Sequence, residues 1–543
     1  MIDPWWYVPQ HARVRYDIEC GSIPNALRQT ARRMPHAEAL VGEDGRRTFA
    51  ELDEDMHAAV RAVLALGVRP GDRVGLWGPN SGRWLVAALG ILGAGAVLVP
   101  LNTRFKGEEA AYVLRKSGAG LLFATSDFLE VDYVGMLRAA DPDLDVLRPG
   151  RTVLLSGPSC AGGLDWREFL AAGSAVPNPD AVAAIDAVGP DSLSDIMFTS
   201  GTTGHPKGVQ LTHGQSLRAH GFYAKLMGFR AGDRYLIIPP FFHTFGYKAG
   251  WMACLVHGAT ILPQRTFDVD DVLDTMERER VSILFGPPTV FQGLLDSPRR
   301  GSADLSALRL TMAASTAVPP ELLERIRDEL RPESMWAGYG LTEATSLVTT
   351  TVADDDFEHL ATTAGRPAWD VEVRILDAGG AELGPGEPGE IAVRGFNVMT
   401  GYWDEPERTA EAIDADGWLH TGDIGTLDEQ GYLRITDRKK DMILVGGFNV
   451  YPAEVERILG RYDGLESIAV VSAPDERLGE VPVAFLVSAP GASIDETAFL
   501  AWARDRIANF KCPRRAHVVA QLPRNASMKV LKNELRALAR ELS

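Results

Sequence analysis

The sequence has few cysteines and no long uninterrupted apolar stretch. Its 543 residues include four cysteines, widely scattered and without the Cys-x-x-Cys or Cys/His spacing of a metal site. A disulfide framework or structural zinc site is therefore not expected. The longest apolar stretch, Trp84–Leu101, is interrupted by glycines and by Pro100. It predicts a helix, a tight turn and a buried strand rather than a membrane span.

Positive charge is also scarce. The chain has 55 lysines and arginines against 73 acidic residues, a net charge of −18. This balance disfavours nucleic acid and anionic membranes as partners, and a polyanionic substrate would need a locally positive site. The segment Met1–Tyr7 lacks the basic region and apolar stretch of a signal peptide. We expect a cytoplasmic protein in a reducing compartment.

The first half of the chain alternates helical and strand patterns. Helical spacing at Phe49–Gly67 and Ser81–Leu92 alternates with strand patterns at Gly71–Trp77 and Ala96–Pro100. The alternation predicts an α/β protein in which helices cover both faces of parallel sheets. The length corresponds to about three or four structural units.

The residue pattern changes after Val371. Strand patterns at Val371–Leu376 and Glu390–Arg394 lie between turns rich in glycine and proline, which indicates a smaller, mostly antiparallel β unit. The segment Gly384–Gly389 fits the G-x-G-x-x-G dinucleotide pattern, but a strand follows it rather than a helix, so we interpret it as a turn.

A run of five charged residues, Asp437–Asp441, indicates a solvated joint between domains. About 100 residues follow it, with a helix at Pro452–Glu456 and strands at Ile468–Val471 and Val481–Val487, enough for an independent α+β domain. We predict an N-terminal domain over 1–436, a hinge over 437–441 and a C-terminal domain over 442–543.

The segment Thr199–Val209 combines glycines, hydroxyl side chains and one lysine, directly after the apolar run Ile196–Phe198. Glycines allow the backbone to approach a ligand closely, and successive N–H groups can bind an anion. Lys207 is followed by Gly208 rather than Ser or Thr, so the segment is not a P-loop. It predicts a polyphosphate-binding loop at the end of a buried strand.

This loop resembles the phosphate-binding motif of the adenylate-forming superfamily, which includes acyl-CoA synthetases, luciferases and nonribosomal peptide adenylation domains. The resemblance covers nearly the whole chain. It implies a large N-terminal domain of parallel α/β sheets plus a small β-barrel-like unit, followed by a small mobile α+β C-terminal domain. The phosphate-binding residues that it implies are Thr199, Ser200, Gly201, Thr202, Thr203, Gly204 and Lys207.

Two later motifs are similar to the superfamily's nucleotide motifs. In Gly338–Glu343, the resemblance implies that Gly338 and Gly340 flank the nucleotide, Tyr339 stacks on adenine, Thr342 contacts the α-phosphate and Glu343 binds Mg²⁺. An alternative is that Thr342 caps a helix.

In His420–Asp423, the resemblance implies that Asp423 accepts hydrogen bonds from the ribose hydroxyls and that Arg438 is a second contact. The alternative for Asp423 is an ordinary turn position.

Further motifs concern the acid and CoA. His243, in an aromatic segment, would border the acyl pocket, with Tyr247, Ser315, Thr316 and Ala317 as pocket residues. Thr316 and Ala317 stand where the family usually has glycines, so their side chains should reshape the pocket.

In the C-terminal region, Lys529 would act on the α-phosphate and carboxylate, although Met528 replaces the usual preceding glycine. Gly446, Gly447 and Phe448 would line the CoA channel. Asp437 matches the hinge position, about which the C-terminal domain would rotate between half-reactions.

Together these motifs predict an AMP-forming acid–CoA ligase that uses ATP, Mg²⁺ and CoA, with no nucleic-acid partner; a homodimer is the expected assembly. Expected acids are medium-chain, aromatic or steroid-derived; the segment Phe241–Gly250 resembles actinobacterial ligases of steroid-ring propanoates. Two alternatives stay open: a free-standing peptide-type adenylation enzyme and a non-catalytic nucleotide-binding protein.

Overall fold

The computed structural model describes residues 21–199, 206–315, 318–438, 441–445, 448–475, 478–507, 509–524 and 530–542, with backbone alone at 437–438 and 448–449. The chain divides into two compact units. Unit 1 runs to Glu372 and includes Arg394–Leu419, and unit 2 comprises Val373–Val393 and the chain from His420 onward. The predicted α/β class, with a large N-terminal and a small C-terminal domain, is confirmed. The proposed boundary at 437–441 stays a prediction.

One sheet of unit 1 carries the polyphosphate loop. Its strand order is β19-β8-β7-β4-β3-β5-β6, with β7, β4, β3, β5 and β6 parallel and β8 and β19 added antiparallel. The predicted strands at 71–77 and 96–100 are confirmed as β3 and β4. The strands are β3 (Arg73–Trp77), β4 (Val97–Leu101), β5 (Leu121–Thr125), β6 (Thr152–Ser156), β7 (Leu193–Thr199), β8 (Lys207–Thr212) and β19 (Gly401–Tyr402).

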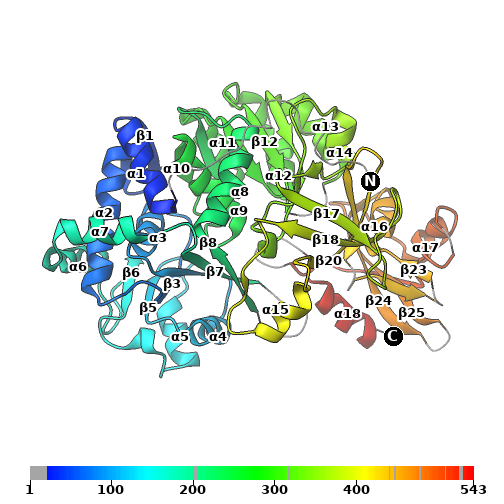
Figure 1. Cartoon of the computed structure of the whole chain (residues 1–543). Coiled ribbons are helices and arrows are strands. Elements are labelled where there is room, and N and C mark those ends of the chain that lie inside the picture. Colours follow the sequence, from blue (N-terminus) through cyan, green and yellow to red (C-terminus); the bar gives the residue numbers. More distant parts are fainter. Residues whose placement is uncertain are drawn as a thin grey trace. The chain divides into compact units, whose positions relative to one another are not determined.

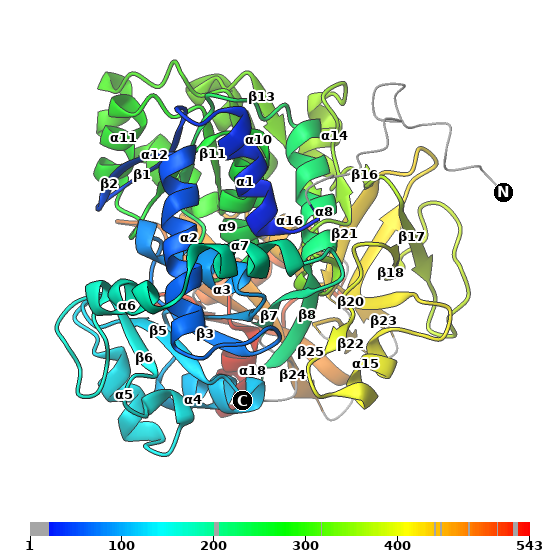
Figure 2. The same ribbon diagram turned by 60° about the vertical axis from the view of Figure 1, so that its left-hand side comes forward.

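The predicted helices beside this sheet are α2 (Phe49–Ala65) and α3 (Gly82–Gly93). Helix α2 begins with a capping box, in which the Thr48 hydroxyl accepts from Glu51 N and the Glu51 carboxylate accepts from Thr48 N. The two helices run against each other at the sheet (Figure 2). Gly90 permits this approach, because a Cβ there would lie 2.7 Å from that of Ala59.

A second sheet of unit 1 has the order β13-β12-β11-β9-β10-β1-β2, parallel except for the terminal hairpin β1–β2. Helix α11 (Val269–Arg278), green in Figure 1, precedes strand β11 of this sheet. The strands are β1 (Glu38–Gly42), β2 (Gly45–Thr48), β9 (Arg234–Ile237), β10 (Thr260–Pro263), β11 (Ile283–Gly286), β12 (Leu310–Ala313) and β13 (Ser334–Trp336).

The other helices of unit 1 cover the sheets or connect their strands. They are α1 (Ile23–Arg33), α4 (Gly107–Ser117), α5 (Tyr133–Ala140), α6 (Trp166–Ala172), α7 (Asn178–Ala187), α8 (His213–Leu226), α9 (Thr244–Gly246), α10 (Ala253–His257), α12 (Pro288–Asp296), α13 (Pro320–Arg325), α14 (Phe357–Thr362) and α15 (Pro406–Ala412).

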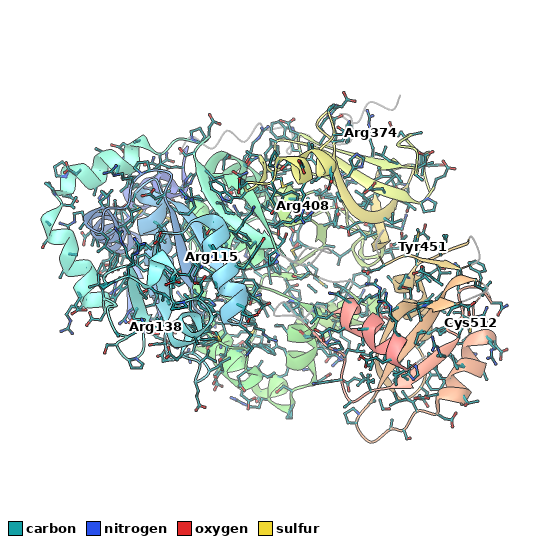
Figure 3. The ribbon with its side chains drawn as sticks, turned by 90° about the horizontal axis from the view of Figure 1, so that it is seen from below. Arg115, Arg138, Arg374, Arg408, Tyr451 and Cys512 are labelled. Carbon is teal, nitrogen blue, oxygen red and sulfur yellow. The ribbon has the colours of Figure 1, made fainter. Side chains whose placement is uncertain are left out.

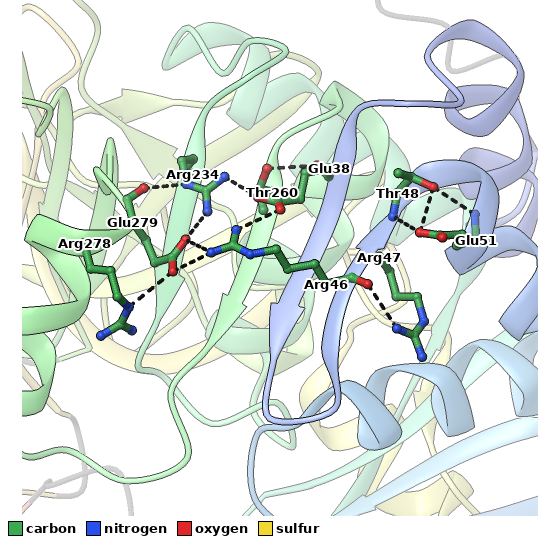
Figure 4. A network of polar contacts seen from close by, with 9 residues as sticks. All are labelled: Glu38, Arg46, Arg47, Thr48, Glu51, Arg234, Thr260, Arg278 and Glu279. Carbon is green, nitrogen blue, oxygen red and sulfur yellow. Dashed lines mark hydrogen bonds and ion pairs between the residues drawn. The ribbon is translucent and has the colours of Figure 1, made fainter.

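An ionic network joins the hairpin β1–β2 to strand β9 and the end of α11 (Figure 4). The Glu279 carboxylate accepts two hydrogen bonds from Arg46 at 2.8 and 3.0 Å and one from Arg234, which also pairs with Glu38. Burial alone would raise the pKa of Glu279, but the hydrogen bonds and charges of the arginines lower it. The network therefore persists at neutral pH and fails only in acid.

Unit 2 contains the small sheet β17-β18-β20-β21 and the C-terminal sheet β23-β22-β25-β24, with β26 on β25. The turn interpretation of 384–389 is confirmed, because β18 follows it directly. The elements are β17 (Val371–Leu376), β18 (Gly389–Gly395), β20 (Leu419–Leu427), β21 (Leu433–Arg438), β22 (Ile443–Val445), β23 (Phe448–Val450), β24 (Leu465–Asp475), β25 (Gly479–Ser488), β26 (Arg515–Val518), α16 (Pro452–Leu459), α17 (Glu496–Arg504) and α18 (Lys532–Glu541).

Three residues show how the C-terminal part of unit 2 packs. Tyr451 directly precedes α16, and Cys512 is fully buried in the core of the C-terminal sheet (Figure 3). Asp441 differs from the expectation of a solvated residue: it is 9% exposed and pairs with Arg536. The guanidinium compensates the charge that burial would otherwise penalise.

Within the described ranges, no helix is both long enough and apolar enough to cross a membrane.

Candidate active site

The two ends of the polyphosphate loop are fixed by a hairpin. Strands β7 and β8 pair antiparallel up to Thr199, the last residue of β7, which lies opposite Lys207, the first residue of β8. The predicted buried strand is therefore present and ends at Thr199, where the predicted loop would begin. Ser200, Gly201, Thr202, Thr203 and Gly204 lie outside the described residues.

Tyr402 connects Lys207 to Glu343, and the sequence analysis missed it. Strand β19 places Tyr402 beside β8, so that Lys207 Nζ lies 4.6 Å from the centre of its ring. Its hydroxyl donates to Glu343 Oε1 at 3.1 Å. Burial, followed by the negative charge of Glu343, raises the pKa of Tyr402 far above its ordinary value. Tyr402 is therefore a permanent donor that orients the carboxylate.

Glu343 lies in a short 3-10 turn, Thr342–Ala344, just after strand β14 (Gly338–Tyr339). The capping alternative for Thr342 is wrong, because Leu341 occupies the cap position and Thr342 begins the turn. Gly340 has a specific steric role: a Cβ there would lie 2.2 Å from the backbone of Ser346. The nucleotide motif therefore packs directly on the turn that follows Glu343.

That following turn holds an unusual backbone. Thr345 and Ser346 both have positive φ, +52° and +58°, which is uncommon for residues with a Cβ. Two buried hydrogen bonds fix the turn: Thr345 Oγ1 donates to Asn397 O at 2.6 Å, and His220 Nε2 lies 2.7 Å from Thr345 O. Burial lowers the pKa of His220 to about 4, so the ring is neutral and Nε2–H donates.

His243 begins the segment predicted to border the acyl pocket. Its Nδ1 accepts a hydrogen bond from Phe245 N at 3.2 Å, so the ring caps helix α9 and its orientation is fixed. The helix packs tightly on the preceding loop, because a Cβ on Gly246 would lie 2.3 Å from Pro239 O. Asn80 Oδ1 accepts from Phe241 N at 2.7 Å and secures the same loop.

Tyr247, a predicted pocket residue, is fully buried. Its ring stacks on Trp251 with a centroid distance of 4.5 Å, and Trp251 contacts Trp84 edge-on at 6.3 Å. Ser315 is exposed just after β12 and has a φ of +80°. Thr316 and Ala317 lie outside the described residues. A pocket role for these four side chains stays a prediction.

In unit 2, the strand register places Arg438 opposite Asp423 on β20 and β21. Asp423 is 8% exposed and lies within a strand, so the alternative of a turn position is wrong. Its N–H donates to Thr421 Oγ1 at 3.1 Å. Asp437 precedes Arg438 in β21, opposite Ile424.

The two C-terminal motifs are bounded by paired backbone. Val445 of β22 lies opposite Phe448 of β23, which closes the loop of Gly446 and Gly447. Leu531 N donates to Pro523 O at 2.8 Å, at the base of the loop containing Lys529. Gly446, Gly447 and Lys529 themselves are outside the described residues.

The residues fit a magnesium ion held jointly with a nucleotide. In the part of the chain that the structure describes, no group of three or more His, Cys, Asp or Glu side chains could hold a metal alone. Mg²⁺ commonly takes one or two carboxylates and completes its shell with phosphates and water. Glu343 suits that arrangement, because Tyr402 contacts both Glu343 and Lys207 at the end of the predicted polyphosphate loop.

Two known sequences similar to this chain are CoA ligases. It is 49% identical to a 7a-methyl-1,5-dioxo-octahydro-1H-inden-4-yl propanoyl:CoA ligase of Mycobacterium tuberculosis, over 95% of this chain and 99% of that protein. A Rhodococcus jostii ligase of the same name is 46% identical, over 95% and 98%.

The fold matches solved structures of the same kind. ATP-bound MatB from Rhodopseudomonas palustris superposes with a TM-score of 0.84 at 29% identity, over 96% of this chain and 99% of that one. The family described as AMP-binding enzyme matches residues 27–403, and its C-terminal domain matches residues 454–529. The chain therefore belongs to the AMP-binding enzyme family and is an AMP-forming acyl-CoA synthetase.

Proposed function

We propose that this synthetase activates a propanoate whose chain bears a fused, keto-substituted carbocycle. The proposal rests on sequence identity, which is higher to the two indenyl-propanoyl:CoA ligases than to relatives named for other acids. Identity is 49% and 46% to the two indenyl-propanoyl:CoA ligases, 39% to a feruloyl-CoA synthase of Amycolatopsis and 34% to a human medium-chain ligase. The acid would attack the α-phosphate of ATP and release pyrophosphate, and CoA would then displace AMP to form the thioester.

We propose that Lys207, and Glu343 through Mg²⁺, neutralise the negative charge of ATP. A carboxylate attacking a polyanion needs that charge neutralised and the two groups aligned. Lys207 would bind phosphate with the rest of the loop, and Glu343 would hold Mg²⁺. Their shared contact with Tyr402, at 4.6 Å and 3.1 Å, supports a common site.

The other nucleotide roles are proposed residue by residue. Tyr339 would stack on adenine, Thr342 would contact the α-phosphate, and Asp423 with Arg438 would bind ribose. Carboxylates accept from two hydroxyls well, and the register of β20 and β21 supports joint use of the last two residues. Lys529 would serve adenylation, whereas Gly446, Gly447 and Phe448 would serve thioester formation after a rotation about Asp437.

The acid would lie near His243. The segment that follows is largely buried and carries the stacked rings of Tyr247 and Trp251. Such a wall suits a bulky, uncharged ring system, for which few polar contacts are needed. Ser315, Thr316 and Ala317 would complete the wall of the pocket.

Two assays test the proposal. Pyrophosphate release is measured with the fused-ring propanoate, ferulate, octanoate and acetate, and AMP release is then measured with and without CoA. We expect the fused-ring acid to have the highest kcat/KM and AMP release to require CoA. A preference for acetate would refute the bulky acid, and no pyrophosphate with any acid would refute the enzyme assignment here.

The proposal also includes Mg²⁺ as the metal, a cytoplasmic location and a homodimer. Sedimentation velocity of the purified chain tests the dimer, and a single monomeric species would refute it.

A further inference from the structure

A fully buried ion pair lies between the strand that leads into the polyphosphate loop and the segment that follows His243. Lys248 Nζ is 2.8 Å from Asp195 Oδ2, and both side chains are 0% exposed. Lys248 Nζ also donates to Ser216 Oγ of helix α8, and Ser194 Oγ donates to Asp195 Oδ2 at 2.7 Å. The contacts thus join three separate elements of unit 1.

Stability alone does not account for this pair. Removing two charges from water is costly, and well-packed apolar residues often replace buried pairs at no loss. Burial lowers the pKa of Lys248, and the charge and hydrogen bond of Asp195, 2.8 Å away, oppose that lowering. We therefore ask which segments of the chain the pair holds in position.

Of the two partners, Asp195 is the one held in place by the sheet. Asp195 lies inside the sheet, paired with Leu98 of β4 on one side and Leu211 of β8 on the other. Four residues later, Thr199 ends β7 at the start of the polyphosphate loop. Asp195 therefore moves only if the sheet moves.

Lys248 belongs to a less regular element. It lies in a π-helical stretch, Tyr247–Met252, in which Gly250 has non-helical φ and ψ of −96° and −109°. Such stretches are rare and recur at functional sites. The Lys248 ammonium also lies 4.9 Å from the ring centre of its neighbour Tyr247. An anchored Lys248 thus fixes the segment from His243 to Tyr247.

We infer that Asp195 and Lys248 are positioning residues for the carboxylic acid: they hold the His243–Tyr247 segment in register with the strand that ends at the polyphosphate loop. The inference rests on the proposed role of His243 in the acid site. Neither side chain touches the acid. Their loss should therefore raise KM for the acid and slow adenylation, while ATP binding through the loop is largely retained.

The test replaces both charges at once, in Asp195→Leu/Lys248→Met, so that no unpaired charge is left buried. We expect KM for the acid to rise about 10- to 100-fold, as for a misplaced reactant. KM for ATP should change less than about threefold, a split that a general loss of folding would not produce. A milder variant, Ser216→Ala, removes one hydrogen bond to Lys248 and should raise KM for the acid by a smaller factor.

A second buried pair in unit 1 provides the matched control. Arg309 and Asp233 are 9% and 3% exposed, and Arg309 also donates to Gly228 O at 2.8 Å. Asp233→Leu/Arg309→Met should lower the melting temperature without changing KM for the acid.

Three outcomes are distinguishable. An inactive wild type would refute the proposed function. An active wild type with unchanged acid KM in both Asp195→Leu/Lys248→Met and Ser216→Ala would refute the inference. Should the double variant not fold, an unchanged acid KM in Ser216→Ala refutes it alone.

Discussion

Tyr402→Phe tests whether the hydroxyl of Tyr402 orients Glu343 for Mg²⁺. The substitution removes the 3.1 Å hydrogen bond and keeps the ring beside Lys207. A hydrogen bond to a charged group contributes about 1.5–3 kcal/mol. Glu343 is only half-buried, so we take the lower end, about 1.5 kcal/mol. That corresponds to about a tenfold loss in kcat/KM for ATP.

The assay is pyrophosphate release at saturating acid, with ATP and Mg²⁺ varied. We expect the Mg²⁺ concentration for half-maximal rate to rise along with the loss in kcat/KM. The matched control is Tyr133→Phe, which loses a hydrogen bond of similar length, 2.8 Å to Thr103 O, in α5. Unchanged Mg²⁺ dependence in Tyr402→Phe, or an equal change in Tyr133→Phe, would refute the reasoning.

Three further substitutions test other parts of the account. Lys529→Ala should slow adenylation by at least about 100-fold yet spare thioester formation from preformed acyl-adenylate; equal losses in the two half-reactions would contradict separate roles. Gly340→Ala should abolish pyrophosphate release, because its Cβ would overlap the backbone of Ser346 at 2.2 Å; wild-type kinetics would show that the turn is free to shift. His220 has its pKa lowered to about 4 by burial, so the unfolded chain takes up a proton first as pH falls below about 6.5, and stability is lost by about 1.4 kcal/mol per pH unit down to about pH 4. Urea unfolding at pH 7 and pH 5.5 measures this, and we expect the free energy of unfolding to fall less between these pH values in His220→Asn than in the wild type. An identical fall in the two proteins would refute a buried neutral ring.

Local signals in the sequence predicted much of the fold. Apolar residues recur at helical spacing along the whole of α2. Leu52, Met56, Val60 and Val63 are all buried, so packing agrees with propensity. The end of β7 at Thr199 was predictable because the apolar run Ile196–Phe198 gives way to glycine, hydroxyl and lysine residues.

The residues that the sequence did not reveal depend on long-range contacts. Tyr402 lies in a two-residue strand, too short for any periodic pattern, and meets Glu343 across 59 positions. Asp195 and Lys248 are 53 positions apart, and nothing local distinguishes them from surface charges. Asp441 is buried because Arg536, far along the chain, compensates it.

We propose that this synthetase couples a bulky ring-bearing propanoate to CoA through an acyl-adenylate. The most direct measurement is kcat/KM for CoA-dependent AMP formation with the fused-ring propanoate, compared with octanoate and ferulate under identical conditions. The account predicts a preference of at least about tenfold for the fused-ring acid, which corresponds to about 1.4 kcal/mol of transition-state discrimination. An equal or higher value for octanoate or ferulate would contradict it.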